Sequence, residues 1–260
     1  MMSKRVLVVL DFDGLLVNSY ALLRDTMAGF GLDVGDEQRF RNRRKFLKYL
    51  GGGKELLNNL VGMGLPKTGR LRERLTACYC ERGYVYPEFI DVLNRMIRSR
   101  HVHCGIVSRN FTLRPGTTIR TVLRRSGIAE EHLDFVVPIP VGAKKTEVLA
   151  GMWAARYQAA LLLADEVGDY HAAREAGYES MMGTYGFDTR ERLMRRGEVP
   201  SHALYDTPAE LAAALRARLA GYRPRFLRWP RWAPGRTGSR RWPPPTNSDL
   251  RGRCTPRDRA

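Results

Sequence analysis

The apolar residues of this chain follow two alternating patterns, short continuous runs and longer segments with helical spacing. The continuous runs are typical of strands that are buried on both faces of a sheet. They predict strands at 6–10, 103–108, 135–139, 160–165, 179–183 and 202–206. The periodic segments predict helices at 87–99, 120–127, 146–158, 170–177 and 208–221. Because strands that alternate with helices favour a parallel sheet covered on both faces, we predict a doubly wound, Rossmann-like α/β core.

The alternation of strands and helices stops between residues 16 and 86, where no strand-like run occurs. Helix-like segments occupy 19–31, 36–51, 53–62 and 67–83 instead. We therefore predict an α-helical cap over 16–86, inserted into a core formed by 1–15 and 87–220. Ligands of open α/β sheets bind beyond the carboxyl ends of the strands, so a cap attached there could close over a bound molecule.

Residues 221–260 have a different composition from the rest of the chain. They hold 11 Arg, no Lys and 2 Asp, together with seven of the 14 prolines and three of the four tryptophans. No helical or strand period is present, which predicts a disordered tail. Arginine interleaved with tryptophan is compatible with binding to nucleic acid or to an anionic membrane surface. We favour an unselected extension over either of these binding roles.

Charge and cysteine content narrow the class of protein. The formal net charge is +17, and the tail contributes 11 − 2 = +9 of it. Cys78, Cys80, Cys104 and Cys254 have neither the spacing of a zinc site nor the density of a disulfide framework. The apolar run at 6–10 is too short for a signal peptide, and no segment is long enough to span a membrane. We expect a cytoplasmic protein.

Two carboxylates follow the first predicted strand directly. Asp11 and Asp13 are separated by one phenylalanine, and Gly14 permits a sharp turn of the backbone after them. Two close carboxylates are tolerated when a cation lies between them or when one of them holds a proton. Oxygen ligands of this kind favour Mg²⁺. By themselves the two acids are also compatible with an ordinary solvated turn.

Other polar residues follow the second and fourth strands and precede a helix. Carboxyl ends of parallel strands meet at one edge of a sheet, so these residues are expected to converge with Asp11 and Asp13. The lysines would offer positive charge to a phosphate group and to its transition state. The residues are Ser108, Arg109 and Asn110 after the second strand, Asp165, Glu166 and Asp169 after the fourth, and Lys144 and Lys145 before the helix.

Four stretches resemble the motifs of the haloacid dehalogenase-like hydrolase superfamily. They are "DFDGLLVNS" at 11–19, "VSRN" at 107–110, "KKTEVL" at 144–149 and "ADEVGDYHAAREAG" at 164–177. The resemblance covers about residues 5–215, and its first and fourth motifs are specific. Ala164 departs from the pattern, since glycine is common at that position. The inserted segment resembles the helical cap of this superfamily, which generally selects the substrate.

The resemblance implies a role for each motif residue. Asp11 would be the nucleophile and a Mg²⁺ ligand. Asp13 would act as general acid and base and offer its backbone carbonyl to the metal. An acid at this position is typical of phosphatases and phosphomutases, and dehalogenases lack it. The remaining implied roles are phosphate or substrate binding by Ser108, Arg109 and Asn110, charge neutralisation by Lys145 with Lys144 as the alternative, and Mg²⁺ ligation by Asp165 and Asp169.

The function that the sequence predicts is a Mg²⁺-dependent phosphatase acting on a small phosphorylated metabolite through an aspartyl-phosphate. A phosphomutase with the same machinery is an alternative. So is a nucleic-acid-binding protein that keeps the fold as a scaffold, but a scaffold has no need for four carboxylates in one cleft. In the cap, the tyrosines Tyr79, Tyr84 and Tyr86 are expected to pack rather than to stack on a base.

Overall fold

The computed structural model describes residues 5–33, 37, 68–140, 142–152 and 157–222. This part of the chain contains one six-stranded sheet in which all neighbouring strands pair in parallel, in the order β3-β2-β1-β4-β5-β6. The strands are β1 (Arg5–Leu10), β2 (Val102–Ser108), β3 (Phe135–Pro138), β4 (Tyr157–Ala164), β5 (Glu179–Gly183) and β6 (Leu204–Tyr205). The predicted doubly wound α/β fold is confirmed.

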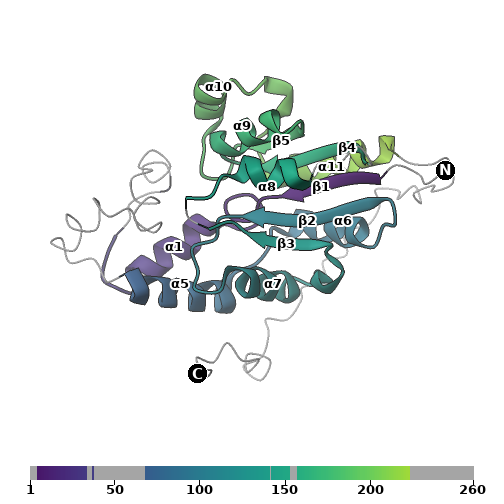
Figure 1. Cartoon of the computed structure of the whole chain (residues 1–260). Coiled ribbons are helices and arrows are strands. Elements are labelled where there is room, and N and C mark those ends of the chain that lie inside the picture. Colours follow the sequence, from purple (N-terminus) through teal and green to yellow (C-terminus); the bar gives the residue numbers. More distant parts are fainter. Residues whose placement is uncertain (1–4, 34–36, 38–67, 141, 153–156, 223–260) are drawn as a thin grey trace, which may run out of the picture.

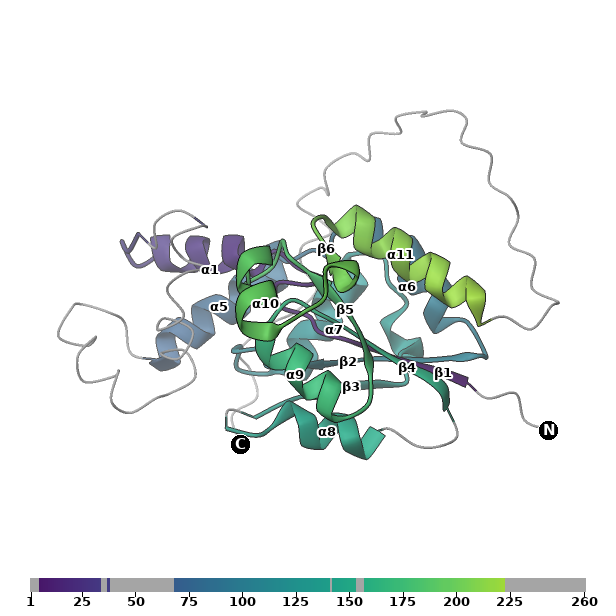
Figure 2. The same cartoon turned by 90° about the horizontal axis from the view of Figure 1, so that it is seen from above.

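Helices cover both faces of the sheet (Figure 1). The helices are α1 (Ser19–Ala28), α5 (Thr68–Arg82), α6 (Pro87–Ile97), α7 (Pro115–Arg125), α8 (Lys145–Met152), α9 (Val167–Glu175), α10 (Arg190–Gly197) and α11 (Pro208–Gly221), with short 3₁₀ turns η1 (Glu130–His132) and η2 (Ser201–Ala203). Apolar residues of α6, α7 and α11 pack on one face, and those of α8, α9 and α10 pack on the other. Figure 2 shows α6 and α11 side by side along the sheet.

Strand β1 shows why a continuous apolar run was required. Its side chains alternate between the two faces, so that Val6, Val8 and Leu10 join one core while Leu7 and Val9 join the other. From β1 the chain passes to β2 and β3 on one side and then crosses to β4 on the other. The reversal lies between β1 and β4, and crevices at such reversals are the usual ligand sites of open α/β sheets.

Some predicted boundaries were wrong. The helix predicted at 146–158 ends at Met152 in the described residues, and Tyr157 and Gln158 already belong to β4. Helix α10 was not predicted, because only Leu193 and Gly197 of its eight residues are buried and no apolar period results. The segments 36–51 and 53–62 fall almost entirely outside the described residues, as does nearly all of the predicted tail.

Helices α1 and α5 are the described parts of the predicted cap, and they pack against each other. The Cys78 thiol lies 3.5 Å from the Leu22 carbonyl oxygen, to which it donates, and Arg82 Nη2 lies 2.8 Å from Asp25 Oδ2. Both helices contribute buried side chains to the same core as α6 and α7. The division of the chain into core, cap and tail stays a prediction.

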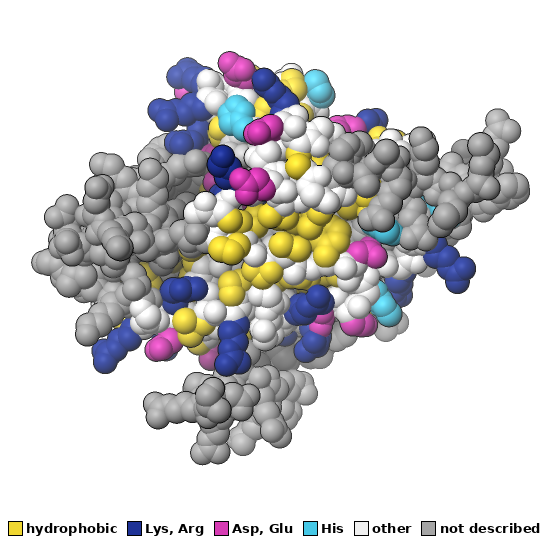
Figure 3. All heavy atoms as spheres, in the orientation of Figure 1, with side chains coloured by type: hydrophobic (Ala, Val, Ile, Leu, Met, Phe, Trp, Pro, Cys, Tyr) yellow, Lys and Arg dark blue, Asp and Glu magenta, His cyan; other side chains and the backbone are white. Residues whose placement is uncertain are grey.

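Strand β3 forms one edge of the described sheet. All four of its residues are only partly buried, and Figure 3 shows apolar side chains gathered over this part of the surface. Charged side chains of both signs surround the apolar area in this view. None of the helices in the described residues combines the length and the apolar character that crossing a membrane requires.

A buried carboxylate fastens α7 to the turn η1. The side chain of Glu130 is 4% exposed and accepts hydrogen bonds from Arg120, at 2.8 Å, and from Arg124. Arg120 also donates to the Glu130 carbonyl oxygen at 3.1 Å. Burial acts to raise the pKa of Glu130, but the two arginines outweigh it and hold the pKa below its ordinary value. Glu130 therefore stabilises the fold only while it is ionised.

We expect Glu130→Gln to lower the free energy of unfolding by about 1–3 kcal/mol at neutral pH, because two charge-assisted hydrogen bonds lose their charge. The depressed pKa means that this stabilisation is present above the unfolded-state pKa and is lost as the pH falls through the folded-state pKa. Urea unfolding of both proteins at neutral and acid pH measures the difference. Glu131→Gln is the matched control, since its side chain is 63% exposed. A difference that grew in acid would contradict this account.

Candidate active site

The loops that follow β1 and β4 lie side by side at the reversal of the sheet. The Asp11 amide donates to the Leu163 carbonyl oxygen at 2.8 Å, which extends the pairing of β1 with β4 by one residue. Asp165 follows β4 at the same edge, and Ser108 ends β2 on the other side of β1. The parallel topology thus brings three separate motifs to one place.

Lys145 joins two of the predicted carboxylates. Its Nζ lies 3.1 Å from Asp11 Oδ2 and 2.6 Å from Asp169 Oδ2, and all three side chains are buried. Lys145 is the first residue of α8, and Asp169 lies in the first turn of α9. The neighbouring Lys144 is exposed. The structure thus places Lys145, which the motif favoured over Lys144, in the cluster.

This ion pairing sets the charge on Asp11. Burial acts to raise the pKa of Asp11, but the positive charge of Lys145, with smaller contributions from Asp169 and Ser108, holds the pKa below its ordinary value. Burial likewise acts to lower the pKa of Lys145, and the charges of Asp11 and Asp169 raise it instead. The pair is therefore Asp11 carboxylate and Lys145 ammonium at neutral pH, which suits a carboxylate nucleophile.

Asp165 is held tightly by the backbone around it. The Phe187 amide donates to its Oδ2 at 2.6 Å. A Cβ atom added at Gly14 or at Gly186 would lie only 2.2 Å from the same oxygen, so both positions require glycine. At Gly14 the φ of +79° independently favours glycine. The other oxygen, Oδ1, is buried and has no hydrogen-bond partner in the described residues.

The carboxylate of Asp13 points toward a set of hydrogen-bond donors. Oδ1 accepts from the Ser19 hydroxyl at 2.8 Å and from the Tyr79 hydroxyl at 2.5 Å. The Asn110 amide donates to Oδ2 at 3.0 Å. Burial raises the pKa of Asp13 to about 6, and these donors oppose the shift while the charge of Asp11 adds to it. Asp13 thus has a higher proton affinity than Asp11, as an acid beside a nucleophile needs.

The three residues of the second motif have different surroundings. Ser108 is 1% exposed, and its hydroxyl has no hydrogen-bond partner in the described part of the chain, although it lies near enough to Asp11 to lower its pKa. Arg109 is exposed, and its Nη2 donates to the Ala143 carbonyl oxygen at 2.9 Å. Asn110 is buried and supports Asp13. Their predicted contacts with substrate stay a prediction.

The side chains of the four predicted metal ligands have different partners in the described residues. Nowhere in the described residues do three or more His, Cys, Asp or Glu side chains group as a metal site. The Asp13 carboxylate is engaged by Ser19, Tyr79 and Asn110, and the Asp169 carboxylate by Lys145. Asp11 is also engaged, by Lys145 and by the Phe12 amide, whereas Oδ1 of Asp165 has no hydrogen-bond partner in the described residues. Ligation of Mg²⁺ by Asp11, Asp165 and Asp169 and by the backbone carbonyl of Asp13 stays what the resemblance implies.

The donor set nevertheless fits a divalent cation. Burial, together with the charges of Asp11 and Glu166, raises the pKa of Asp165 well above its ordinary value. A cation beside Asp165 would relieve this repulsion and would occupy the unpartnered Oδ1. Hard oxygen donors favour Mg²⁺ over softer metals.

Residues that the sequence analysis missed support this geometry from the loop after β5. The carboxylate of Asp188, wholly buried, accepts the Val167 amide at 2.8 Å and pairs with Arg192 Nε at 2.9 Å. Asp188 thereby holds Val167, the first residue of α9, which lies between Asp165 and Asp169 in the sequence. The signal was available, because "TYGFD" at 184–188 follows a predicted strand and should reach the same sheet edge.

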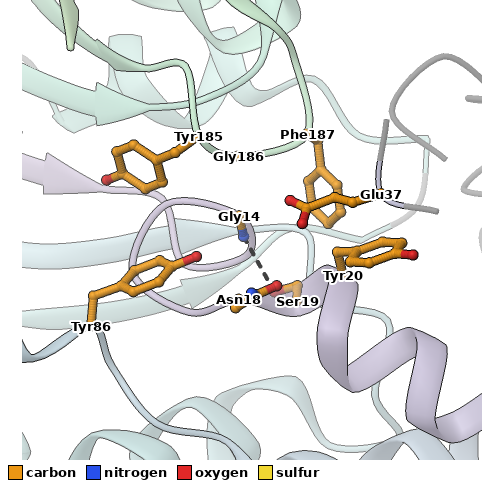
Figure 4. A pocket seen from close by; sticks show the side chains of 9 residues that line it. All are labelled: Gly14, Asn18, Ser19, Tyr20, Glu37, Tyr86, Tyr185, Gly186 and Phe187. Carbon is orange, nitrogen blue, oxygen red and sulfur yellow. Dashed lines mark hydrogen bonds between the residues drawn. The ribbon is translucent and has the colours of Figure 1, made fainter. Parts of the chain in front are cut away.

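A shallow pocket opens beside Gly14 (Figure 4). At one end Tyr86 and Tyr185 meet edge to face with ring centroids 5.6 Å apart. Tyr20, Glu37 and Phe187 lie at the other end. The pocket is therefore formed where the described part of the predicted cap meets the core and the loop after β5.

Comparisons with known proteins agree with the motifs. No family model matches the chain. A phosphoglycolate phosphatase from Synechococcus elongatus is 26% identical over 218 residues, which are 80% of this chain and 96% of that protein.

Two solved structures show the same fold. A haloacid dehalogenase-like family hydrolase from Streptococcus pneumoniae has a TM-score of 0.55 and 19% identity, covering 82% of this chain and 100% of its own. A structure described as a putative β-phosphoglucomutase from Thermotoga maritima has a TM-score of 0.55 and 16% identity, and the match covers 81% of this chain and 98% of that one. In its four motifs, its strand order and these likenesses together, the chain is similar to the haloacid dehalogenase-like hydrolases.

Proposed function

We propose that this chain is a Mg²⁺-dependent phosphatase that hydrolyses a small phosphomonoester through a covalent phosphate on Asp11. The observation that carries the proposal is the pairing of a buried, ionised Asp11 with Lys145, next to a second acid, Asp13, of higher pKa. A nucleophile and a proton donor of this kind are what a two-step displacement at phosphorus needs.

In the first step, an oxygen of Asp11 attacks the phosphorus atom of the substrate. A bond forms between that oxygen and phosphorus, and the bond from phosphorus to the leaving oxygen breaks. The electron pair of the broken bond goes to the leaving oxygen, which takes a proton from Asp13. Lys145 stays beside Asp11 and offsets negative charge on the phosphoryl oxygens. Ser108 would donate its hydroxyl, which has no partner in the described residues, to one of these oxygens.

In the second step, water cleaves the aspartyl-phosphate. Asp13, now ionised, takes a proton from the water as its oxygen bonds to phosphorus. The bond between phosphorus and the Asp11 oxygen breaks, which regenerates the Asp11 carboxylate and releases inorganic phosphate. Asp13 ends the cycle protonated, as it began, so one residue serves as acid and then as base.

Mg²⁺ would be held by the carboxylates of Asp11 and Asp165 and by the backbone carbonyl of Asp13, with Asp169 nearby. When bound it supplies positive charge that draws the phosphate toward the nucleophile and stabilises the transition state. The buried, unpartnered Oδ1 of Asp165 supports this assignment. The surrounding backbone keeps the Asp165 carboxylate rigid, since Gly14 and Gly186 leave room for its Oδ2 and the Phe187 amide donates to that oxygen.

The function is tested with a panel of phosphorylated metabolites, in which phosphoglycolate comes first because of the name of the cyanobacterial relative. We expect release of inorganic phosphate that depends on Mg²⁺. A phosphomutase would use the same residues but return the phosphate to the sugar, so conversion of a sugar phosphate without phosphate release would identify that activity instead. If no member of the panel were turned over with Mg²⁺ present, both the phosphatase and the phosphomutase activity would be contradicted.

We expect Asp165→Asn to weaken Mg²⁺ binding at least about 10- to 100-fold, because loss of an outer-shell partner of a metal ligand already has an effect of that size. The amide keeps an oxygen for the Phe187 N–H and nearly the same volume, but it removes the charge that the ion would meet. Isothermal titration of Mg²⁺ into the protein without substrate measures the effect independently of turnover. Asp206→Asn is the control, because Asp206 has a 55% exposed side chain that pairs with Arg190. Unchanged Mg²⁺ affinity in Asp165→Asn would reject Asp165 as a ligand.

A further inference from the structure

Helix α5 touches the active site through one of its faces. Arg72, Thr76 and Tyr79 lie at spacings of four and three residues, which places them in line along the helix. Each of the three makes a hydrogen bond to a loop that carries a candidate active-site residue. The helix belongs to the predicted cap, so these bonds connect the predicted cap with the loops that carry the candidate reacting groups.

Tyr79 makes the direct connection. Its side chain is 4% exposed, and its hydroxyl donates to Asp13 Oδ1 at 2.5 Å. The ring packs in the core, with its centroid 6.4 Å from that of Phe12. Burial and the neighbouring Asp13 raise the pKa of Tyr79 well above its ordinary value, so the phenol keeps its proton. A rigid, protonated donor thus faces one defined oxygen of Asp13.

A second arm reaches Asp13 through the loop after β2. Arg72 donates to the carbonyl oxygens of Phe111, at 3.1 Å, and Thr112, at 2.9 Å. Thr112 donates from its amide, at 3.1 Å, and from its hydroxyl to Asn110 Oδ1, which fixes the orientation of the amide that donates to Asp13. The Thr76 hydroxyl accepts the Leu113 amide at 2.9 Å. The same helix face therefore holds Asp13 from two directions.

We propose that Tyr79 is a positioning residue for Asp13, which it holds in the orientation required for proton transfer to the leaving group. The inference rests on the proposed phosphatase activity and adds to it a residue of the predicted cap that acts on the chemistry through Asp13. Tyr79 contacts the Asp13 carboxylate and acts on the proton transfer through it. Among the described residues that donate to the Asp13 carboxylate, only Tyr79 comes from a helix outside the four motifs.

The chemistry of the leaving group provides a specific readout. An alkyl alcohol is a poor leaving group and needs a proton as its bond to phosphorus breaks, whereas p-nitrophenolate leaves without one. Losing the orientation of a general acid therefore slows alkyl phosphates selectively. The ratio kcat/KM reports only on steps up to formation of the aspartyl-phosphate, so the later role of Asp13 as a base does not enter. A purely structural defect would lower kcat/KM for both substrates by the same factor.

We expect Tyr79→Phe to lower kcat/KM about 10-fold for an alkyl phosphate and less than about 2-fold for p-nitrophenyl phosphate. The 10-fold loss is smaller than the whole contribution of a general acid, because Asp13 itself is retained. Tyr84→Phe is the matched control. Its hydroxyl is also hydrogen-bonded, accepting from Arg125 Nη2 at 2.8 Å, but its side chain is exposed. Asp13→Ala provides the full leaving-group signature for comparison, and Tyr79→Met serves if the phenylalanine variant does not fold.

Equal losses on both substrates, or no loss on the alkyl phosphate, would overturn the positioning role while leaving the phosphatase itself intact. A faster alkyl reaction would overturn it as well, since it would mean that Tyr79 restrains Asp13 in an unproductive orientation. Wild-type protein that is inactive on both phosphates with Mg²⁺ present would overturn the proposed function first and this inference with it. The two failures are therefore distinguishable.

Discussion

Asp11→Asn is expected to lower phosphatase activity about 10,000-fold or more, as removal of an essential nucleophile does in other enzymes. The asparagine amide has nearly the same volume but is a far weaker nucleophile than a carboxylate. The substitution also removes one of the two negative charges beside Lys145, which keeps its 2.6 Å contact with Asp169. Phosphate release from p-nitrophenyl phosphate with saturating Mg²⁺ measures the loss, and thermal unfolding shows that the variant is folded.

Asp91→Asn is the matched control for Asp11→Asn. Asp91 lies on α6 with a 55% exposed side chain, paired with Arg95 at 2.8 Å, so the same chemical change there should leave activity within about twofold. If the Asp11 variant kept activity within about tenfold of the wild type, Asp11 would not be the group that attacks phosphorus.

Lys145→Met is expected to lower activity about 100- to 1,000-fold, the range found when a preorganised charge or donor at a transition state is removed. Methionine retains the length and the apolar contacts of the buried side chain but not the ammonium group. Asp11 would then lack the charge that holds its pKa down, and the phosphoryl oxygens would lack a counter-charge. The measurement is kcat for phosphate release at saturating substrate and Mg²⁺.

Lys144→Met is the matched control for Lys145→Met, since the two lysines are adjacent and the motif favoured Lys145 while keeping Lys144 as the alternative. Lys144 is exposed, whereas Lys145 is 4% exposed and bridges two carboxylates. We expect Lys144→Met to retain activity within about twofold. A loss that is as large for Lys144 as for Lys145 would contradict the arrangement of the buried cluster.

The sequence predicted the elements that depend on many residues at once. Strand β5 was predicted at its observed bounds, as was helix α11, because each is encoded by a pattern that repeats along its own length. Errors occurred where such a pattern was weak or ambiguous. At Tyr157 a helix-compatible position pairs with Arg5 of β1 instead, and Gln158 falls at the register shift that follows, because pairing within the sheet outweighs local helix preference.

The sequence by itself determined which acids follow which strands, and hence that Asp11, Asp13, Asp165 and Asp169 reach one edge of the sheet. Only the tertiary structure decided that Lys145 pairs with Asp11 and that Tyr79 of α5 donates to Asp13. The hydrogen bond from the Phe187 amide, in the loop after β5, to Asp165 was likewise decided by the tertiary structure. The physical reason is the range of the interactions. A strand and the residue at its end are specified locally, by period and by direction, whereas a contact such as that of Tyr79 with Asp13 joins positions 66 residues apart, and no repeating pattern records it.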